Sequence, residues 1–167
     1  MACRGVFFAI TSDDAQRLIT ATSDAAVLTI VQEEIEQAWD EGHLQETDKA
    51  WDAMHRCLTD GTLRRNQGLY PLDHCVLNGR QLHKGSEYIV SFLAPNEVRD
   101  VALALQPISK DWFREKYFRI DPEDYGVPLV PFNEDDFEYT WAYFEEVREF
   151  YSKAAKEGRH VIFTVDQ

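Results

Sequence analysis

One predicted helix carries a carboxylate and an imidazole three residues apart. Asp52 and His55 lie within the helix predicted at 47–61, and this separation places both side chains on one helix face. A carboxylate that orients an imidazole is part of many general-base sites. His55 also lies in the last turn of its helix, where the helix dipole favours the protonated imidazolium, a donor for anions. The alternative is a boundary histidine that is simply bonded to Asp52.

The basic residues of the chain are concentrated in segment 55–85. Five Lys and Arg residues stand there against two acids, a charge of +3, whereas the remainder carries 12 bases against 28 acids, a charge of −16. Half of the eight glycines lie in the same segment, and glycine lets backbone N–H groups approach a ligand closely. Arginine supplies planar donors for carboxylate or phosphate. The segment predicts a small-anion site that includes His74, Gly79 and Arg80. The alternative is that its bases pair with acidic helices of the same chain.

The spacing of histidines and cysteines predicts no metal site. His55 and Cys57 lie about 200° apart around a helix, and His74 and Cys75 point to opposite faces of the extended segment predicted at 74–77. No CxxC, HxxxH or HExxH spacing occurs. Cys57 is expected to act as a small buried hydrophobe. GxGxxG, Walker A and GxSxG motifs are also missing from the sequence, so we predict no cofactor.

Composition and charge argue against several classes of function. The 167 residues, 44% apolar and 28% charged, suit a single globular domain spanning 1–167. The net charge of −13 opposes the counterion release on which nucleic-acid binding depends, and it opposes anionic membranes. No apolar run approaches the ~20 residues that span a bilayer. Three cysteines, an odd number, fit a reducing compartment. We therefore expect a soluble cytoplasmic protein that binds neither nucleic acid nor membrane.

The hydrophobic pattern predicts the elements that must position these residues. Strands are predicted at 3–10, 74–77, 88–93 and 160–165. Helices are predicted at 13–21, 24–40, 47–61 and 95–107, after Ser109, and at 134–156, with a proline-rich loop over 122–131. About four strands among about six helices, without regular alternation, predict an α+β fold: a mixed sheet covered by helices.

The helix predicted at 134–156 carries aromatic side chains over about 200° of its circumference. A stripe this wide indicates packing on more than one side. We interpret the rings as core rather than as the lining of a ligand pocket, because large aromatics dominate protein cores. The acidic face of the same helix is a candidate homodimer interface.

A longer pattern of residues resembles that of a known family. The string Asp48-Lys49-x-Trp51-x-x-x-His55-x-x-Leu58-Thr59 is followed by Pro71-Leu72 and by Val76-Leu77-x-Gly79-x-x-Leu82. In residue types, order and spacing it resembles the YfbM-like family of small bacterial proteins, and the similarity extends through nearly the whole chain. The resemblance implies a compact single domain of mixed α and β structure without an assigned activity, so it carries over no catalytic residue. It draws attention to Asp48, Trp51, His55 and Gly79.

Two hypotheses about function follow from these features. The first is a non-enzymatic binding module for a protein partner or a small anion, since an acidic surface attracts a basic partner through forces that salt weakens. Its candidate ligand-binding residues are Asp48, Trp51, His55, His74, Gly79 and Arg80. The second is an enzyme for a small anionic substrate, with His55 oriented by Asp52 and the anion held by Arg80. The second hypothesis requires His55, His74 and Arg80 to meet in one cleft.

Overall fold

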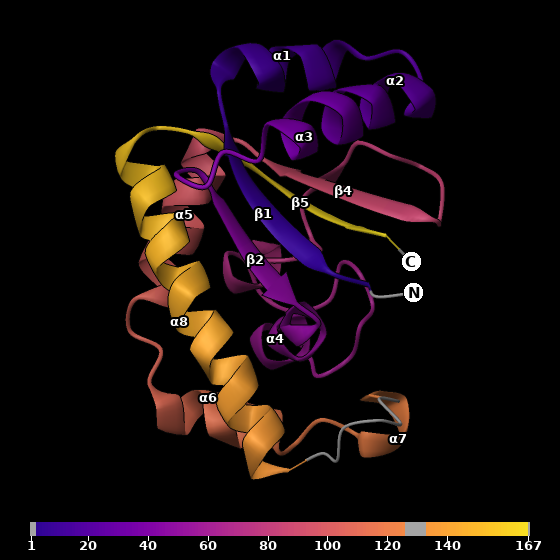
Figure 1. Ribbon diagram of the computed structural model, residues 1–167. Helices are drawn as coiled ribbons and strands as arrows, with labels where there is room; N and C mark the ends of the chain where they lie inside the picture. Colours follow the sequence, from indigo (N-terminus) through magenta and orange to yellow (C-terminus); the bar gives the residue numbers. More distant parts are fainter. Residues whose placement is uncertain (1–2, 126–132, 167) are drawn as a thin grey trace.

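An antiparallel sheet runs through the middle of the molecule (Figure 1). The computed structural model describes residues 3–125 and 133–166. Within these residues the sheet has five strands, in the order β2 (Leu44–Asp48), β1 (Gly5–Ile10), β5 (His160–Asp166), β4 (Tyr88–Leu93) and β3 (Arg80–Gln81). Every neighbouring pair is antiparallel. The α+β class is confirmed, with five strands instead of about four and antiparallel pairing in place of a mixed sheet.

Side chains alternate between two cores on opposite faces of the sheet. On β1, Phe7 and Ala9 enter the larger core, whereas Phe8 and Ile10 enter the smaller one. The central strands β4 and β5 are buried along almost their whole length. A strand covered on both faces needs apolar side chains on both, which explains why these strands are nearly uninterrupted apolar runs.

The N-terminal helices cover the face of the smaller core (Figure 1). They are α1 (Ser12–Thr20), α2 (Asp24–Leu28), a π-helical stretch (Thr29–Ile35) and α3 (Glu36–Ala38). Ser23 caps α2, because its hydroxyl accepts a hydrogen bond from the backbone N–H of Ala26 in the first turn at 3.1 Å. Beyond the π-helical stretch, the Glu36 carboxylate accepts hydrogen bonds from the hydroxyls of Tyr88 and Thr164 on the sheet.

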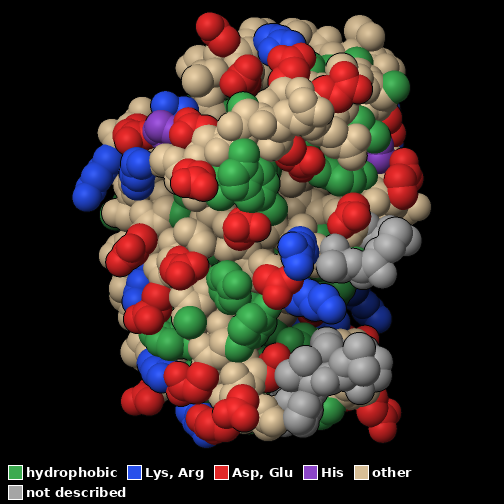
Figure 2. Space-filling view, in the orientation of Figure 1, with side chains coloured by type: hydrophobic (Ala, Val, Ile, Leu, Met, Phe, Trp, Pro, Cys, Tyr) green, Lys and Arg blue, Asp and Glu red, His purple; other side chains and the backbone are tan. Residues whose placement is uncertain are grey.

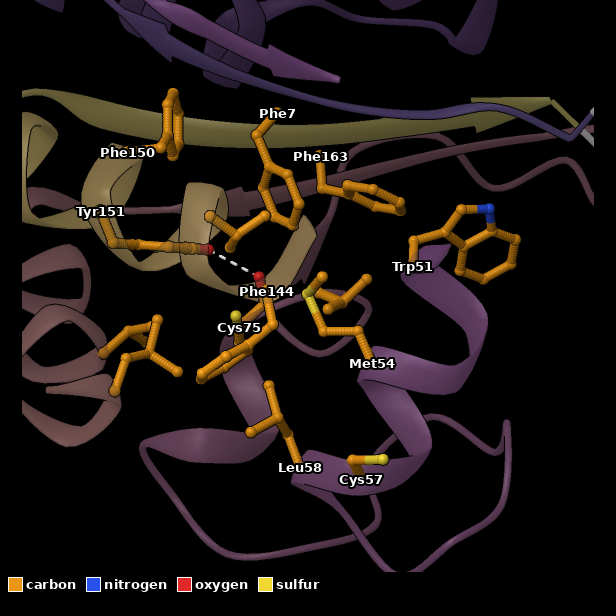
Figure 3. Packing of buried hydrophobic residues seen from close by; sticks show 14 of the residues in the cluster. Phe7, Trp51, Met54, Cys57, Leu58, Cys75, Phe144, Phe150, Tyr151 and Phe163 are labelled. Atoms are coloured by element: carbon orange, nitrogen blue, oxygen red, sulfur yellow. Dashed lines mark hydrogen bonds between the residues drawn. The ribbon is translucent and has the colours of Figure 1, made fainter. Parts of the chain in front are cut away.

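The remaining helices pack around the larger core on the other face (Figure 1). They are α4 (Ala50–Leu58), α5 (Pro95–Leu105), α6 (Lys110–Tyr117), α7 (Pro122–Tyr125) and α8 (Glu134–Lys156). The aromatic stripe of α8 lies in this core: Phe137 and Phe144 are fully buried, and the Tyr151 hydroxyl donates to the Cys75 carbonyl at 2.6 Å (Figure 3). The interpretation of these rings as core is confirmed for the buried Phe137, Trp141, Phe144, Phe150 and Tyr151, whereas Tyr139 and Tyr143 are half-buried.

Three local predictions differ from the structure. Residues 44–48 form the edge strand β2, which the sequence analysis did not predict, and the helix expected from Thr47 begins only at Ala50. The extended segment expected at 74–77 is absent, because Leu72–His74 forms a single 3-10 turn. In the proline-rich segment, α7 replaces the start of the expected loop, and residues 126–132 lie outside the described residues.

Candidate functional site

The first two candidate residues, Asp48 and Trp51, lie where β2 passes into α4. Asp48 adopts the left-handed backbone conformation with φ 45°, and its carboxylate accepts a hydrogen bond from the Tyr139 hydroxyl of α8 at 2.9 Å. Trp51 donates from Nε1 to the Cys3 carbonyl at 2.9 Å and packs against Phe163 of the sheet (Figure 3). Both side chains therefore join α4 to neighbouring elements of the same chain.

His55 lies on the buried side of α4, with 1% of its surface exposed. Its Nε2 is 3.5 Å from the Arg64 carbonyl, and burial lowers the pKa of His55 to about 4. The Asp52 carboxylate accepts instead from Arg56 Nε at 2.6 Å. Asp52 is thus bonded to Arg56 and not to His55, contrary both to the enzyme hypothesis and to the alternative of a boundary histidine, because the permanently charged guanidinium one turn away is the stronger partner for a carboxylate. The protonated His55 expected from the helix dipole is not seen either, because burial is the larger effect. His55 is neutral at neutral pH.

Arg56 is the buried base of segment 55–85, which the structure describes completely. Its side chain is 3% exposed and lies between two carboxylates, with Nε 2.6 Å from Asp52 Oδ1 and Nη1 2.5 Å from Asp124 Oδ2. Burial raises the pKa of Asp52, and the hydrogen bond from Arg56 opposes that rise. For this base, the alternative of pairing within the chain is the correct one.

Three further arginines of the segment are exposed: Arg64, Arg65 and Arg80, which we call the arginine cluster. Among the described residues, no carboxylate lies within the 4.0 Å of an ion pair from any of these guanidinium groups. Arg64 acts on the pKa of one acid, Asp60, only weakly. A hydrogen bond from Thr62 is the main cause that lowers the pKa of Asp60, and the charge of Arg64 is the smallest cause. The positive charge of the cluster is therefore available to molecules outside the chain.

Hydrogen bonds hold the loop that carries Arg64 and Arg65 beside β3, which carries Arg80. The Asn78 side chain accepts from the Asn66 backbone at 2.8 Å and donates to the Gln67 carbonyl at 3.0 Å. Arg65 Nη1 donates to Gln81 Oε1 at 3.3 Å. The loop that follows α4 is thereby held along the start of β3, so that arginines distant in the sequence lie on adjacent segments.

His74 and Gly79, two further candidates, support the same loops. His74 Nδ1 is 2.8 Å from Asp73 Oδ1, and the His74 ring meets the Tyr70 ring edge-on at 4.9 Å. A Cβ on Gly79 would lie 2.8 Å from the Phe92 carbonyl oxygen, closer than real Cβ atoms approach. Glycine at this position therefore lets the turn before β3 lie directly against β4.

An open cavity of about 440 Å³ adjoins the cluster at Arg64. Its lining residues are Asp60, Gly61, Thr62, Leu63, Arg64, Arg119, Asp121 and Asp124. Sequence reasoning missed its contribution from 119–124, because no spacing relates that segment to Arg64. Neither this cavity nor the other three measured on the described residues is lined by His55, His74 or Arg80. None of these four cavities joins the three residues that the enzyme hypothesis places in one cleft.

Thiol and metal chemistry find no support in the described part of the chain. Cys57 and Cys75 are 1% exposed, and burial raises the pKa of both thiols (Figure 3). Among residues 3–125 and 133–166, no group of three His, Cys, Asp or Glu side chains is placed to hold a metal ion. No helix of this part is both long enough and apolar enough to cross a membrane.

Comparisons with known proteins give the chain a family. A family model described as "Domain of unknown function (DUF1877)" matches residues 1–164. The chain belongs to this family. The DUF1877 fold is also seen in a solved structure, "The Crystal Structure of a Protein of Unknown Function YfbM from Escherichia coli". That match has a TM-score of 0.69 and 20% sequence identity, and it covers 97% of this chain and 99% of that chain. A search of curated proteins gave no match.

The expected YfbM-like resemblance is confirmed, and the DUF1877 domain of this chain shows what the resembling residues do. Asp48, Trp51, His55 and Gly79 each hold one element of the fold against another. The family description assigns no activity. The functional question therefore moves from the motif residues to the exposed groups that they support, foremost the arginine cluster.

Proposed function

We propose that this DUF1877 protein is a non-enzymatic binding module whose arginine cluster takes up an anionic group, a carboxylate or a phosphate, of a small ligand or a protein partner. One observation carries the proposal. In a chain of net charge −13, three exposed guanidinium groups on adjacent loops have no carboxylate partner among the described residues. The planar donors of arginine match the oxygens of both anionic groups.

Other exposed bases of the molecule show what the cluster lacks. Arg17 forms two hydrogen bonds with Glu34, at 2.6 and 2.7 Å, and Lys110 is 2.7 Å from Glu138. Acids are abundant in this chain, and seven of its eleven arginines form an ion pair within the described part of the molecule. Guanidinium groups without a carboxylate partner, on segments held by hydrogen bonds, support recognition of an outside anion, since little reorganisation precedes binding.

The state of the candidate catalytic groups supports binding rather than turnover. His55 is neutral and has no orienting carboxylate, and Cys57 and Cys75 are buried thiols with raised pKa values. These groups are occupied in holding the fold. The three cysteines are free thiols, which fits the reducing cytoplasm that we propose as the location.

The test compares two triple variants with equal changes in charge. The first variant, Arg64→Gln, Arg65→Gln and Arg80→Gln, neutralises the cluster. The matched control, Arg17→Gln, Lys110→Gln and Arg114→Gln, removes three bases that are paired with acids. Binding of inorganic pyrophosphate and of a short oligoglutamate peptide is measured by calorimetry at about 20 mM and about 200 mM salt.

The wild-type chain and the control variant should bind at least one of the two probes, and more weakly at the higher salt. The cluster variant should lose about tenfold or more in affinity, about 1.4 kcal/mol. Equal affinities of the two variants, or no binding of either probe to the wild type, would falsify the proposal. Preference for a single-stranded oligonucleotide over both probes would replace it with nucleic-acid binding.

A further inference from the structure

The edge of the sheet opposite the arginine cluster is a second exposed surface. Strand β2 occupies this edge and, among the described residues, pairs only with β1. The outer side of an edge strand carries backbone N–H and C=O groups without strand partners. An extended segment of another protein can add to such an edge through main-chain hydrogen bonds.

A groove runs between the free edge of β2 and helix α8. It encloses a cavity of about 330 Å³ that is lined by Leu44, Gln45 and Glu46 of β2 and by Ala142, Tyr143 and Glu146 of α8. We call it the β2–α8 groove. The Gln45 amide crosses it, donating to Glu146 Oε2 at 2.7 Å and to the Glu46 carbonyl at 2.8 Å. That carbonyl accepts from a side chain, which an incoming backbone N–H can replace.

We propose that the β2–α8 groove binds an extended, basic segment of a partner protein, which adds to the sheet as a strand next to β2. The observation behind it is a free strand edge that borders a groove with acidic walls. Glu46 and Glu146 are both exposed and border this cavity, but Glu46 pairs with Val6 and so points to the face of the sheet opposite α8. Figure 2 looks onto β2 and α8 and shows acidic side chains along both elements. Basic side chains on one face of an added strand would lie near Glu146, and those on the other face would lie near Glu46.

Tyr143 gives the groove an apolar wall with a polar tip. Its ring is half-buried beside Tyr139, with ring centroids 5.1 Å apart, and its hydroxyl has no hydrogen-bond partner within the described residues. Burial raises the pKa of Tyr143, as do the carboxylates of Asp48, Glu146 and Glu46. An aliphatic side chain of the added strand can cover the ring, while a basic group enters the negative potential around it.

Charge decides between a basic partner and a second copy of this chain. Antiparallel pairing of β2 with β2 of another copy would bring Glu46 and Glu146 toward the same residues of that copy. Like charges placed opposite each other across paired strands are destabilising. A basic segment has the opposite preference, and the net charge of −13 adds a long-range attraction that salt weakens. The groove is therefore suited to a partner of opposite charge.

The experiment uses a short acetylated peptide of alternating lysine and valine as the probe. Two controls accompany it: the same peptide with glutamate in place of lysine, and a version N-methylated at every residue, whose backbone donates no strand hydrogen bond on either edge. Affinity is measured by calorimetry, and amide hydrogen exchange locates the contact. We expect binding of the lysine peptide alone, with slower exchange at amides of residues 44–48.

Two variants of the full chain test the location of binding. Ala142→Trp fills the groove from an exposed position of α8, and Ala25→Trp places the same ring on an exposed position of α2. Ala142→Trp should weaken the lysine peptide by about tenfold or more, and Ala25→Trp should leave its affinity within about twofold. Circular dichroism establishes that each variant is folded.

A charge variant keeps the test decisive if Ala142→Trp does not fold. Glu46→Gln with Glu146→Gln should lower the affinity by about threefold or more, whereas Glu33→Gln with Glu123→Gln, two exposed acids elsewhere, should not. Absence of lysine-peptide binding, or equal binding of the glutamate or methylated peptide, overturns the proposal. Light scattering that shows a dimer of the wild type and a monomer of Ala142→Trp assigns the groove to a second copy instead. The arginine-cluster variant should bind the lysine peptide like the wild type, so the two proposals fail separately.

Discussion

Acidification should destabilise the protein through His55, because its imidazole is buried in the neutral form. The pKa of His55 is about 4 in the folded protein, against 6.5 for the free side chain. The pH is lowered from about 7 to about 5 for the wild type and for the variant His55→Gln. The substitution removes the titrating group and retains an Nε2 donor near the Arg64 carbonyl. The wild type should lose more stability than the variant over this range.

The direction and size of the effect follow from proton binding. Above pH 6.5 both folded and unfolded states hold neutral His55, and its contribution to stability is complete. Between pH 6.5 and about 4 the unfolded state binds a proton that the folded state does not, so the free energy of unfolding falls as pH falls. The two pKa values give a loss of about 2 kcal/mol between about pH 7 and about pH 5.

Urea denaturation of both proteins at the two pH values measures the free energy of unfolding. The loss of stability of the variant is subtracted from that of the wild type. This difference cancels the contributions of titrating groups that both proteins share, including His160, whose pKa is also lowered by burial. Proton NMR of the imidazole Cε1–H groups then follows the titration of His55. Its signal is the one that the wild type shows and the His55→Gln variant lacks. Equal losses in the two proteins, or a His55 midpoint at or above 6.5, would refute the buried neutral histidine and restore a charged one.

Three further outcomes are expected. Arg56→Met should lower the free energy of unfolding by about 3–5 kcal/mol in urea denaturation, because it leaves a partly buried carboxylate without its cation; a loss below about 1 kcal/mol contradicts this. Gly79→Ala should cost about 1–3 kcal/mol, since the added Cβ meets the Phe92 carbonyl at 2.8 Å, and an unchanged thermal midpoint counts against it. Cys57 and Cys75 should react with a thiol-specific disulfide reagent only after unfolding; labelling of either in the native state disproves their protected position.

The elements with strong local patterns could be predicted from the sequence. Helix α8 spans Glu134–Lys156 and strand β4 spans Tyr88–Leu93, both as expected. Strand β2 escaped prediction because Leu44–Asp48 holds one large apolar residue, and its pairing with β1 defines it. Asp48 then turns the chain into α4 in a left-handed conformation. Aspartate adopts this conformation more often than most residues, but it does so too rarely for the sequence to predict it.

The candidate site was located by charge counting, but its members could not be sorted that way. Arg56 and Arg64 look alike in the sequence, yet one is buried against Asp124, a residue distant in the chain, and the other is exposed. The sequence also does not show which residue bonds to Asp52, since His55 and Arg56, three and four residues further along the helix, can both contact its side chain. Long-range packing decides which charges remain free, and local spacing carries no signal of it.

The central claim is that the arginine cluster is the anion-recognising surface of this protein. Heteronuclear NMR of the arginine side-chain Nε–Hε groups tests it directly, during titration of the wild-type chain with the oligoglutamate peptide and, separately, with pyrophosphate. The account predicts that the signals of Arg64, Arg65 and Arg80 shift with one common saturation curve, while those of the paired Arg17 and Arg114 stay in place. Shifts of equal size at all five arginines, or at none of them with either probe, would contradict it.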